Sequence, residues 1–298
     1  MHVSIRRRSF GSAFFISHNL ITMTRLKRTF FLLLVFIPFE LFPQQHPLPV
    51  ESASLTESGH AQFDFSTAYF HQQYFPLSGL TGGLTKVGNI RFSVSLSDFV
   101  ELQTDGTLLN ILHITQRIPA FNSLRTVSTN PTADIGDFTF WTKFALLSEY
   151  SSGIGFSFRF GVQLPNASNE SGLGIDEMNF YSSLLFQKHL AGIWALNFGI
   201  GILGDPTLVG QQHDVFIYGI GYTLPVSDAT YLRLEYAGRR GHEGIGIYHL
   251  DNVKFAVEKE FGELTLRAAG ISNISAHDHS KGIELTASYI FQFIDIKR

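Results

Sequence analysis

The sequence predicts an all-β fold, a transmembrane antiparallel up-and-down β-barrel of about 12 strands, with roughly 10 to 14 allowed. The segment Gly153 to Leu164 reads GIGFSFRFGVQL, in which every second residue is large and apolar. This period places those residues on one face of a strand and the others on the opposite face. Most other segments repeat the pattern, with polar loops between them. We therefore expect apolar faces against lipid and polar faces around a closed lumen.

The composition favours this class of protein over its competitors. The 298 residues include 29 Phe, 10 Tyr and 27 Gly, while only 16% are charged. The mean hydropathy of +0.11 is high for a soluble protein and low for a helical membrane bundle, as expected when half of each strand is polar. The net charge of -3 is close to balanced, so it gives no indication of a nucleic-acid partner. Because the chain has no Cys, disulfides, thiol catalysis, Cys-ligated zinc and a lipoprotein anchor are excluded.

The N-terminal region is expected to direct export. One continuous apolar run, Phe30 to Phe42, follows Arg25, Lys27 and Arg28, which is the order of a signal peptide. The run is shorter than the roughly 20 residues of a membrane-spanning helix. We expect residues 1–45 to be the signal peptide region, with Met23 as a possible true start and cleavage between residues 43 and 53. A polar leader (46–60), the barrel (61–293) and a short tail (294–298) follow.

Alternation places the strands along the rest of the chain. They are expected at residues 61–72, 88–97, 99–113, 136–147, 153–164, 177–189, 193–202, 213–224, 230–239, 248–259, 263–271 and 282–293. A Gly-rich loop is expected at 76–83, and a bulge near Gly106, where alternation weakens. Short and long connections alternate, so both chain ends should lie on the short-turn side, as in bacterial barrels. The alternative is a soluble β-sandwich or lipocalin-like barrel.

Aromatic residues gather near the expected strand ends, which is typical of the girdles of membrane barrels. They are Tyr150, Trp194, Tyr222, Tyr231, Phe261 and Phe293.

The block from Asp134 to Leu147 (DIGDFTFWTKFALL) continues through Gly153 to Ser168 (GIGFSFRFGVQLPNAS). It resembles putative outer-membrane transporters of the phenol-degradation meta-pathway type. That family has a Gly-Asp opening, an aromatic strand and a strand ending in Leu-Pro before a Gly-rich loop. Gln163-Leu164-Pro165 and Gly172-Leu173-Gly174 stand at the matching places, whereas Asn166 departs from the family's Thr-Gly. The resemblance implies passage of small hydrophobic or aromatic compounds and no catalytic residues.

The inward charges are the candidate lumen-lining and substrate-path residues. They are Arg91, Glu101, Asp105, Asp137, Lys143, Arg159, Arg233, Glu235, Lys254, Glu258, Arg267 and Glu284. Rings of charge can select solutes in a channel. The same charges could instead seal the lumen with salt bridges, and a barrel of this size lies between filled and open ones.

Three other polar features are candidate sites. His277-Asp278-His279 has the alternation of a metal site, but a solvated loop is the preferred interpretation, and no metal or cofactor is expected. Arg239, at the end of an expected strand, and Arg240, at the start of the external loop that follows, could contact lipopolysaccharide phosphates. Ser182, Ser183 and His189 show no spacing that identifies a nucleophile and base, so a barrel-embedded lipid hydrolase remains only an alternative.

These observations predict a non-enzymatic channel or transporter in the bacterial outer membrane that passes a small hydrophobic or aromatic compound. The alternatives are the lipid hydrolase and a non-conducting structural or surface-recognition barrel. The expected partners are outer-membrane lipid and lipopolysaccharide, the small-molecule solute, and the assembly machinery during insertion.

Overall fold

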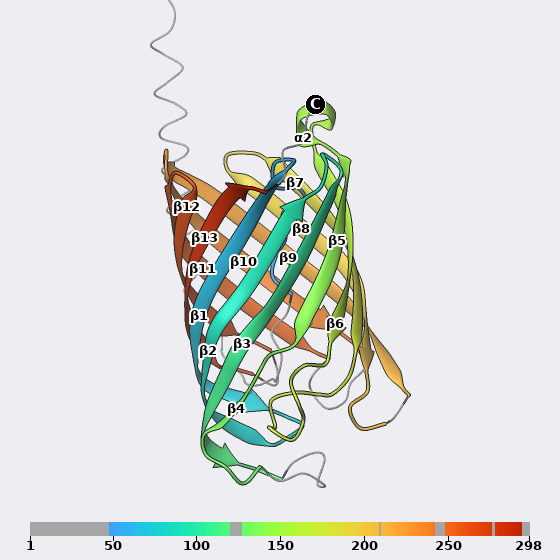
Figure 1. Cartoon of the computed structure of the whole chain (residues 1–298), viewed down its shortest axis with the longest axis vertical. Helices are drawn as coiled ribbons and strands as arrows, with labels where there is room; N and C mark the ends of the chain where they lie inside the picture. The colour runs from blue at the N-terminus through green and yellow to red at the C-terminus, as the bar shows by residue number, and fades with distance from the viewer. Residues whose placement is uncertain (1–47, 120–126, 209, 242–247, 276–277, 294–298) are drawn as a thin grey trace, which may run out of the picture. The chain divides into compact units, whose positions relative to one another are not determined.

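The computed structural model describes residues 48–119, 127–208, 210–241, 248–275 and 278–293, which belong to one compact unit. Its strands form a tilted barrel (Figure 1). The elements are β1 (His60–Phe75), β2 (Leu80–Ser95), β3 (Val100–Arg117), β4 (Thr132–Asp134), β5 (Phe138–Leu147), α2 (Glu149–Ser152), β6 (Gly155–Leu164), β7 (Asn179–His189), β8 (Ile193–Gly204), β9 (Gln212–Ser227), β10 (Thr230–Arg240), β11 (Leu250–Phe261), β12 (Leu264–Asn273) and β13 (Lys281–Gln292).

The strands pair antiparallel in sequence order and close on themselves. β1 pairs with both β2 and β13, and His60 lies opposite Gln292. β3 continues the sheet to β5 through a ladder from Val100 to Asp105, while the short β4 pairs farther along β3. The result is a closed antiparallel barrel of 12 strands, which confirms the predicted fold class. In the described residues, no helix has the length and apolarity needed to cross a membrane.

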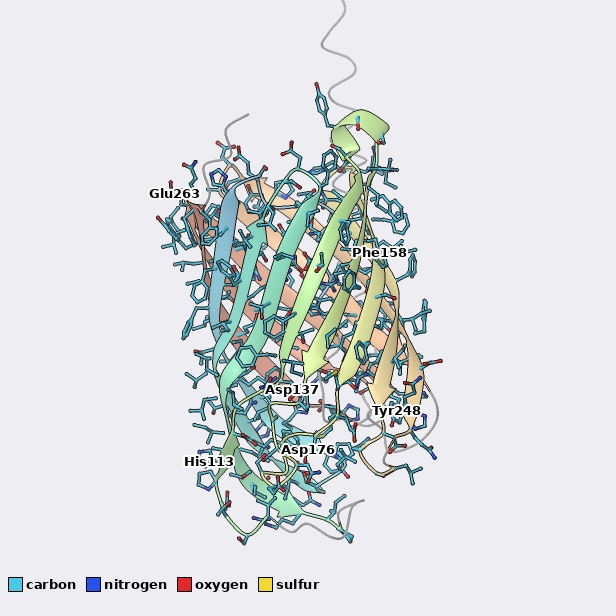
Figure 2. The ribbon with its side chains drawn as sticks, turned by 45° about the vertical axis from the view of Figure 1, so that its right-hand side comes forward. His113, Asp137, Phe158, Asp176, Tyr248 and Glu263 are labelled. Atoms are coloured by element: carbon cyan, nitrogen blue, oxygen red, sulfur yellow. The ribbon has the colours of Figure 1, made fainter. Side chains whose placement is uncertain are left out.

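The two faces of the wall have opposite chemistry. On β6, Ser157 and Arg159 point inward and are 0% and 3% exposed, whereas the outward Phe160 is 45% exposed. Phe158 lies on the same outer face (Figure 2). An apolar exterior around a polar interior is the reverse of a soluble barrel or sandwich, and it matches a barrel whose exterior contacts hydrocarbon. The soluble alternative therefore does not describe this chain.

The hairpin β1–β2 is longer than expected. The loop predicted at 76–83 is wrong for residues 80–83, which belong to β2; Gly79, with φ of 68°, makes the turn instead. The Gly residues of this stretch are needed for close packing: a Cβ on Gly82 would lie 2.0 Å from the His113 carbonyl oxygen. The extended hairpin contributes to an apolar cluster inside the barrel, made by Ala68, Phe70, Phe75, Leu80, Leu84, Leu112, Ile114 and Ile271.

The bulge expected near Gly106 is wrong, because Gly106 pairs with Ile90 in regular register; on β3 the shift lies at Thr115, and β2 has another at Gly88. Ser66 pairs with Asn89 and Thr67 with Val87, so Gly88 is left without a partner on β1, and its φ is +66°. A backbone in this region favours glycine, and such a bulge bends the strand.

The connections divide the barrel into a short-turn end and a long-loop end. Glu263 marks a short turn and Asp176 a long connection at the opposite end (Figure 2). β1 begins and β13 ends at the short-turn end, as the alternation of short and long connections predicted for the barrel strands. The turn expected at residues 148–152 contains the one-turn helix α2. The signal peptide region and the tail 294–298 lie outside the described residues.

Candidate functional site: a chain segment inside the barrel

Residues 48–59, here called the leader segment, lie inside the barrel. At the short-turn end, Gly59 N donates to the Ser95 carbonyl oxygen at 2.9 Å. At the other end of the segment, Leu48 packs against a buried cluster that includes Trp141 and Tyr248. Tyr248 lies toward the long-loop end (Figure 2). The segment therefore runs along the lumen, where the sequence analysis expected only wall side chains.

The Glu51 carboxylate is the centre of the contacts between the leader segment and the wall. Lys143 Nζ and Gln103 Nε2 donate to Oε1 at 3.1 and 3.2 Å. Arg159 Nη1 lies 3.4 Å from Oε2, and the Arg91 guanidinium donates to the same oxygen. These donors come from β2, β3, β5 and β6. A buried carboxylate is tolerated only when such charged partners replace its water shell.

The backbone of the leader segment is also held by the wall. Asn197 on β8 accepts from Glu51 N at 2.6 Å and donates to the Glu51 carbonyl at 2.8 Å, so one amide satisfies both backbone groups. Further contacts join Ser157 Oγ to Ala53 O at 2.5 Å, Lys143 Nζ to Ser54 O at 2.6 Å, and Thr56 N to Glu101 Oε2 at 2.6 Å. Hydrogen-bonded backbone can be buried without the cost of unpaired polar groups.

Glycines in β9 leave room for this segment. A Cβ on Gly219 would lie 3.1 Å from Val50 Cγ2, and one on Gly221 would lie 3.1 Å from Val50 Cγ1. Both glycines lie on the inner face, between outward residues such as Ile220. Mid-strand glycine often marks a place where another backbone approaches closely, and here that backbone is the chain's own.

An aromatic stack adjoins the carboxylate. The Arg159 guanidinium carbon lies 4.3 Å from the centroid of the Trp141 ring, which stacks on Tyr181 with centroids 5.7 Å apart. Trp141 Nε1 donates to Asp105 at 2.7 Å. These contacts fix the Arg159 side chain on a flat apolar surface inside the lumen.

A second group of charges lies on the other side of the lumen and is paired within the wall. Arg233 lies 2.9 Å from Glu235 and 3.6 Å from Glu258, which also accepts from Arg267 Nε at 2.7 Å. Lys254 Nζ donates to Glu284 at 2.5 Å. A cavity of about 290 Å³ lies between this group and the leader segment. It is lined in part by Ser52, Ser54, Tyr231 and Glu260.

The structure divides the predicted lumen residues into three sets. Arg91, Glu101, Asp105, Lys143 and Arg159 surround the leader segment, while Arg233, Glu235, Lys254, Glu258, Arg267 and Glu284 form the wall-paired group. Asp137 joins neither of them. It precedes β5 and accepts from Ala167 N at 2.9 Å, near the long-loop end (Figure 2). Burial there raises the pKa of the Asp137 carboxyl.

The sequence did not predict that Glu51, Gln103, Trp141, Ser157 and Asn197 belong to one site. Glu51 lies in the polar leader (46–60), which was expected to precede the barrel. The available signal was the set of uncharged polar residues at inward positions, such as Ser157 and Asn197, which can hydrogen-bond a backbone.

The solvated loop expected at His277-Asp278-His279 is wrong for Asp278, which is 0% exposed and has a structural role. Asp278 accepts from Gln73 Nε2 at 2.9 Å, Asn273 Nδ2 at 2.6 Å and Ser280 N at 2.6 Å. Burial raises the pKa of this carboxyl to about 6. His277 lies outside the described residues, among which no group of three His, Asp or Glu could hold a metal ion.

Arg239 lies in a strand, as predicted, whereas the loop placement of Arg240 is wrong. Both belong to β10, which continues to Arg240. Arg239 is 4% exposed, and the Arg240 guanidinium pairs with Asp251 at 2.5 Å. Arg239 is thus too buried to reach a lipid phosphate.

Two histidines lie beside carboxylates near the barrel ends. His189 Nδ1 lies 2.6 Å from Glu149, and His213 Nε2 lies 2.8 Å from Asp205. The Thr207 hydroxyl donates to Asp205 at 2.6 Å. In a nucleophile–base–acid triad, the hydroxyl must instead donate to the imidazole, so Thr207, His213 and Asp205 are not arranged as a triad.

No family model matches the sequence, and no curated protein matches it. Solved structures of similar architecture are outer-membrane β-barrels. They include an anion-selective porin from Comamonas acidovorans (9% identity over 78% of this chain and 98% of the porin, TM-score 0.40) and the outer-membrane channel DcaP of Acinetobacter baumannii (9%, 81% and 100%, TM-score 0.37). LpxR from Salmonella typhimurium is another (7%, 77% and 100%, TM-score 0.40). Similarity of this degree identifies no function.

Proposed function

We propose that this protein is an outer-membrane channel for a small hydrophobic or aromatic solute, and that its leader segment closes the lumen in the state described above. The leader segment would leave the wall to admit the solute, and the long loops would form the outer entrance. In this proposal the chain is exported by its signal peptide region and inserted by the assembly machinery of the outer membrane. Lipid and lipopolysaccharide would surround its apolar belt.

The proposal is supported by the fact that a separate segment of the chain obstructs the lumen. The lumen beside β2 to β9 is occupied by a segment held through hydrogen bonds and ion pairs around Glu51. It belongs to no strand of the barrel. A segment held in this way can dissociate while every ladder of the barrel stays paired, whereas a lumen filled by wall side chains could open only by deforming the barrel.

The apolar character of the proposed solute follows from the inner surface. Trp141, Tyr181 and Tyr248 belong to one buried inner cluster, and Phe70, Leu84 and Leu112 to another. A path that passes such surfaces favours a solute with an apolar or aromatic body. The resemblance of residues 134–168 to transporters of the phenol-degradation meta-pathway type points to the same class of solute.

A disulfide can test whether the leader segment controls passage, because the natural chain has no Cys. A Cβ on Gly221 would lie 3.6 Å from Val50 Cβ, within the range that a disulfide requires. We expect the Val50→Cys, Gly221→Cys double variant to conduct in planar bilayers when reduced and to stop conducting when oxidised. Each single variant serves as a control, since it cannot form the crosslink. Equal conductance before and after oxidation, with the crosslink verified by mass spectrometry, would refute the proposal.

Liposome swelling tests the solute class. Aromatic acids should enter liposomes that contain the reduced double variant faster than sugars of similar size. The alternative of a non-conducting barrel is favoured by the dense salt bridges of the lumen, and it predicts no passage of any solute in either redox state. The lipid hydrolase remains an untested alternative, for which release of fatty acid from lipopolysaccharide is the direct measurement.

A further inference from the structure

We propose that the group formed by Arg91, Gln103, Lys143 and Arg159 is a binding site for the carboxylate of an aromatic solute, and that Glu51 occupies it in the closed state. This inference rests on the proposed channel function, since it names the chemical class of the solute. It also gives the leader segment a means of release: a carboxylate that binds the wall competes directly with Glu51.

The geometry around Glu51 is that of a carboxylate receptor. Both oxygens are engaged, Oε1 by Lys143 and Gln103, and Oε2 by Arg91 and Arg159. Lys143 and Arg159 are 1% and 3% exposed, so they are fixed by their surroundings. Donors that converge on both oxygens from four strands favour a planar carboxylate over a single-point acceptor.

The wall alone supplies fewer direct contacts to these cations. Among the described residues, the salt bridges of Arg91 and Arg159 are those with Glu51, while Lys143 also lies 3.7 Å from Glu101. Asp64 and Asp105 face Arg91 from the neighbouring strands and help to balance its charge. The opposite group differs, because Arg233, Arg267 and Lys254 have their carboxylates within the wall. Loss of Glu51 therefore creates a vacancy for an anion on one side of the lumen only.

The aromatic preference follows from Trp141. Its ring lies against Arg159 and continues into Tyr181, so a flat apolar surface adjoins the cations. A benzene ring attached to the carboxylate could reach this surface, whereas a sugar acid would leave its hydroxyls against it without partners. The cavity of about 290 Å³ on the other side of the leader segment offers space into which that segment could shift.

Tryptophan fluorescence gives a direct measurement, because the chain has two Trp and only Trp141 lies in the site. In a Trp194→Phe background, Glu51→Ala removes the internal carboxylate. We expect benzoate to change Trp141 fluorescence with an apparent affinity at least about tenfold higher than in the chain that keeps Glu51, because an internal competitor acts at millimolar effective concentration. Benzamide, which has the same shape and no charge, should show no such difference. Glu51→Gln is the second variant, since it keeps the side-chain volume if Glu51→Ala fails to fold.

Removal of the receptor residues completes the test. Arg159→Gln and Lys143→Met, each combined with Glu51→Ala, should abolish the preference for benzoate over benzamide. If benzamide binds as well as benzoate, or if the preference survives both substitutions, the inference is overturned. Conductance of the reduced Val50→Cys, Gly221→Cys variant without benzoate binding would overturn this inference alone. Benzoate binding in a protein that never conducts would overturn the channel function.

Discussion

Lys143 Nζ lies 3.1 Å from Glu51 Oε1, although 92 positions separate the two residues in the sequence. Lys143 belongs to β5, and Glu51 belongs to the leader segment, which joins no ladder of the barrel. The same ammonium donates to the Ser54 carbonyl oxygen at 2.6 Å. One wall cation therefore fixes both a side chain and a backbone group of the leader segment.

Glu51→Gln should loosen the leader segment and leave the barrel folded. The change removes a buried charge and takes from Arg91, Lys143 and Arg159 the carboxylate that they share, and the loss of one partner of a buried ion pair costs about 3 to 5 kcal/mol. Hydrogen exchange should therefore speed up by at least about tenfold at the amides of residues 50–56, and stay unchanged in the strands. Glu57→Gln is the matched control, because the Glu57 side chain is 76% exposed. Equal exchange in the two variants would contradict this role of Glu51.

Gly219→Val should displace the leader segment by steric overlap. A Cβ at this position would lie 3.1 Å from Val50 Cγ2, and valine adds two further methyl groups there. The strand itself tolerates valine well. We expect cleavage after Glu51 or Glu57 by a glutamate-specific protease at least about tenfold faster than in the unmodified chain.

The control for this prediction is Gly270→Val, since a Cβ on Gly270 meets no atom within 4 Å. Adding Val50→Ala to Gly219→Val should restore protection by returning the lost space. Protection that is unaffected by Gly219→Val would show that the contact with β9 is unimportant.

Phe160→Lys should destabilise the protein in a bilayer. Phe160 lies on the outer face of β6 and is 45% exposed. A lysine on the lipid face near the membrane centre costs about 2 to 4 kcal/mol. Urea unfolding in phospholipid vesicles should show a loss of that size, whereas Tyr150→Lys should have little effect, because Tyr150 on α2 is 101% exposed at the short-turn end. A neutral result for Phe160→Lys would argue against a lipid-facing exterior.

Asp278 should make stability depend on pH. Burial raises its pKa from the usual 3.8 to about 6. A carboxyl whose pKa is raised on folding stabilises the native state most when protonated, so its contribution is complete below pH 3.8 and is lost as the pH rises through 6. The rise of the pKa from 3.8 to about 6 corresponds to a contribution of roughly 3 kcal/mol to the free energy of unfolding.

Asp278→Asn should remove this dependence. Relative to the unmodified chain, the variant should gain stability in urea unfolding as the pH rises from about 4 to about 7. Glu149→Gln serves as the control at the other barrel end, where hydrogen bonds from His189 outweigh desolvation and lower the pKa of Glu149. If the difference in unfolding free energy between Asp278→Asn and the unmodified chain stays constant across this range, Asp278 is not the origin of the pH dependence.

The barrel could be predicted from the sequence because its governing signal is local. Alternation along β6 or β13 assigns each side chain to a face without knowledge of the partner strand. Outward Ile283 and Leu285 are 65% and 64% exposed, as their positions predicted. Strand ends were less predictable: Gly82 and Gly83 suggested a loop, but both lie in β2, where a neighbouring backbone needs the space.

The site was only half predictable, because its two halves carry different signals. Arg91, Lys143 and Arg159 alternate with apolar residues, so their inward direction was readable. Glu51 stands in a polar stretch without periodicity, which is also typical of a solvated linker. Its position depends on contacts with residues up to 146 positions away, such as Asn197, and no local pattern encodes such contacts.

The convergence of β2, β3, β5, β6 and β8 on Glu51 constrains the order of assembly. The receptor for this carboxylate does not exist until Arg91, Lys143 and Arg159 have been brought together by neighbouring strands. The leader segment comes before all of these strands in the chain, yet it can dock only after they have paired. The part of the described chain that is synthesised first therefore acquires these contacts only after strands that are synthesised later.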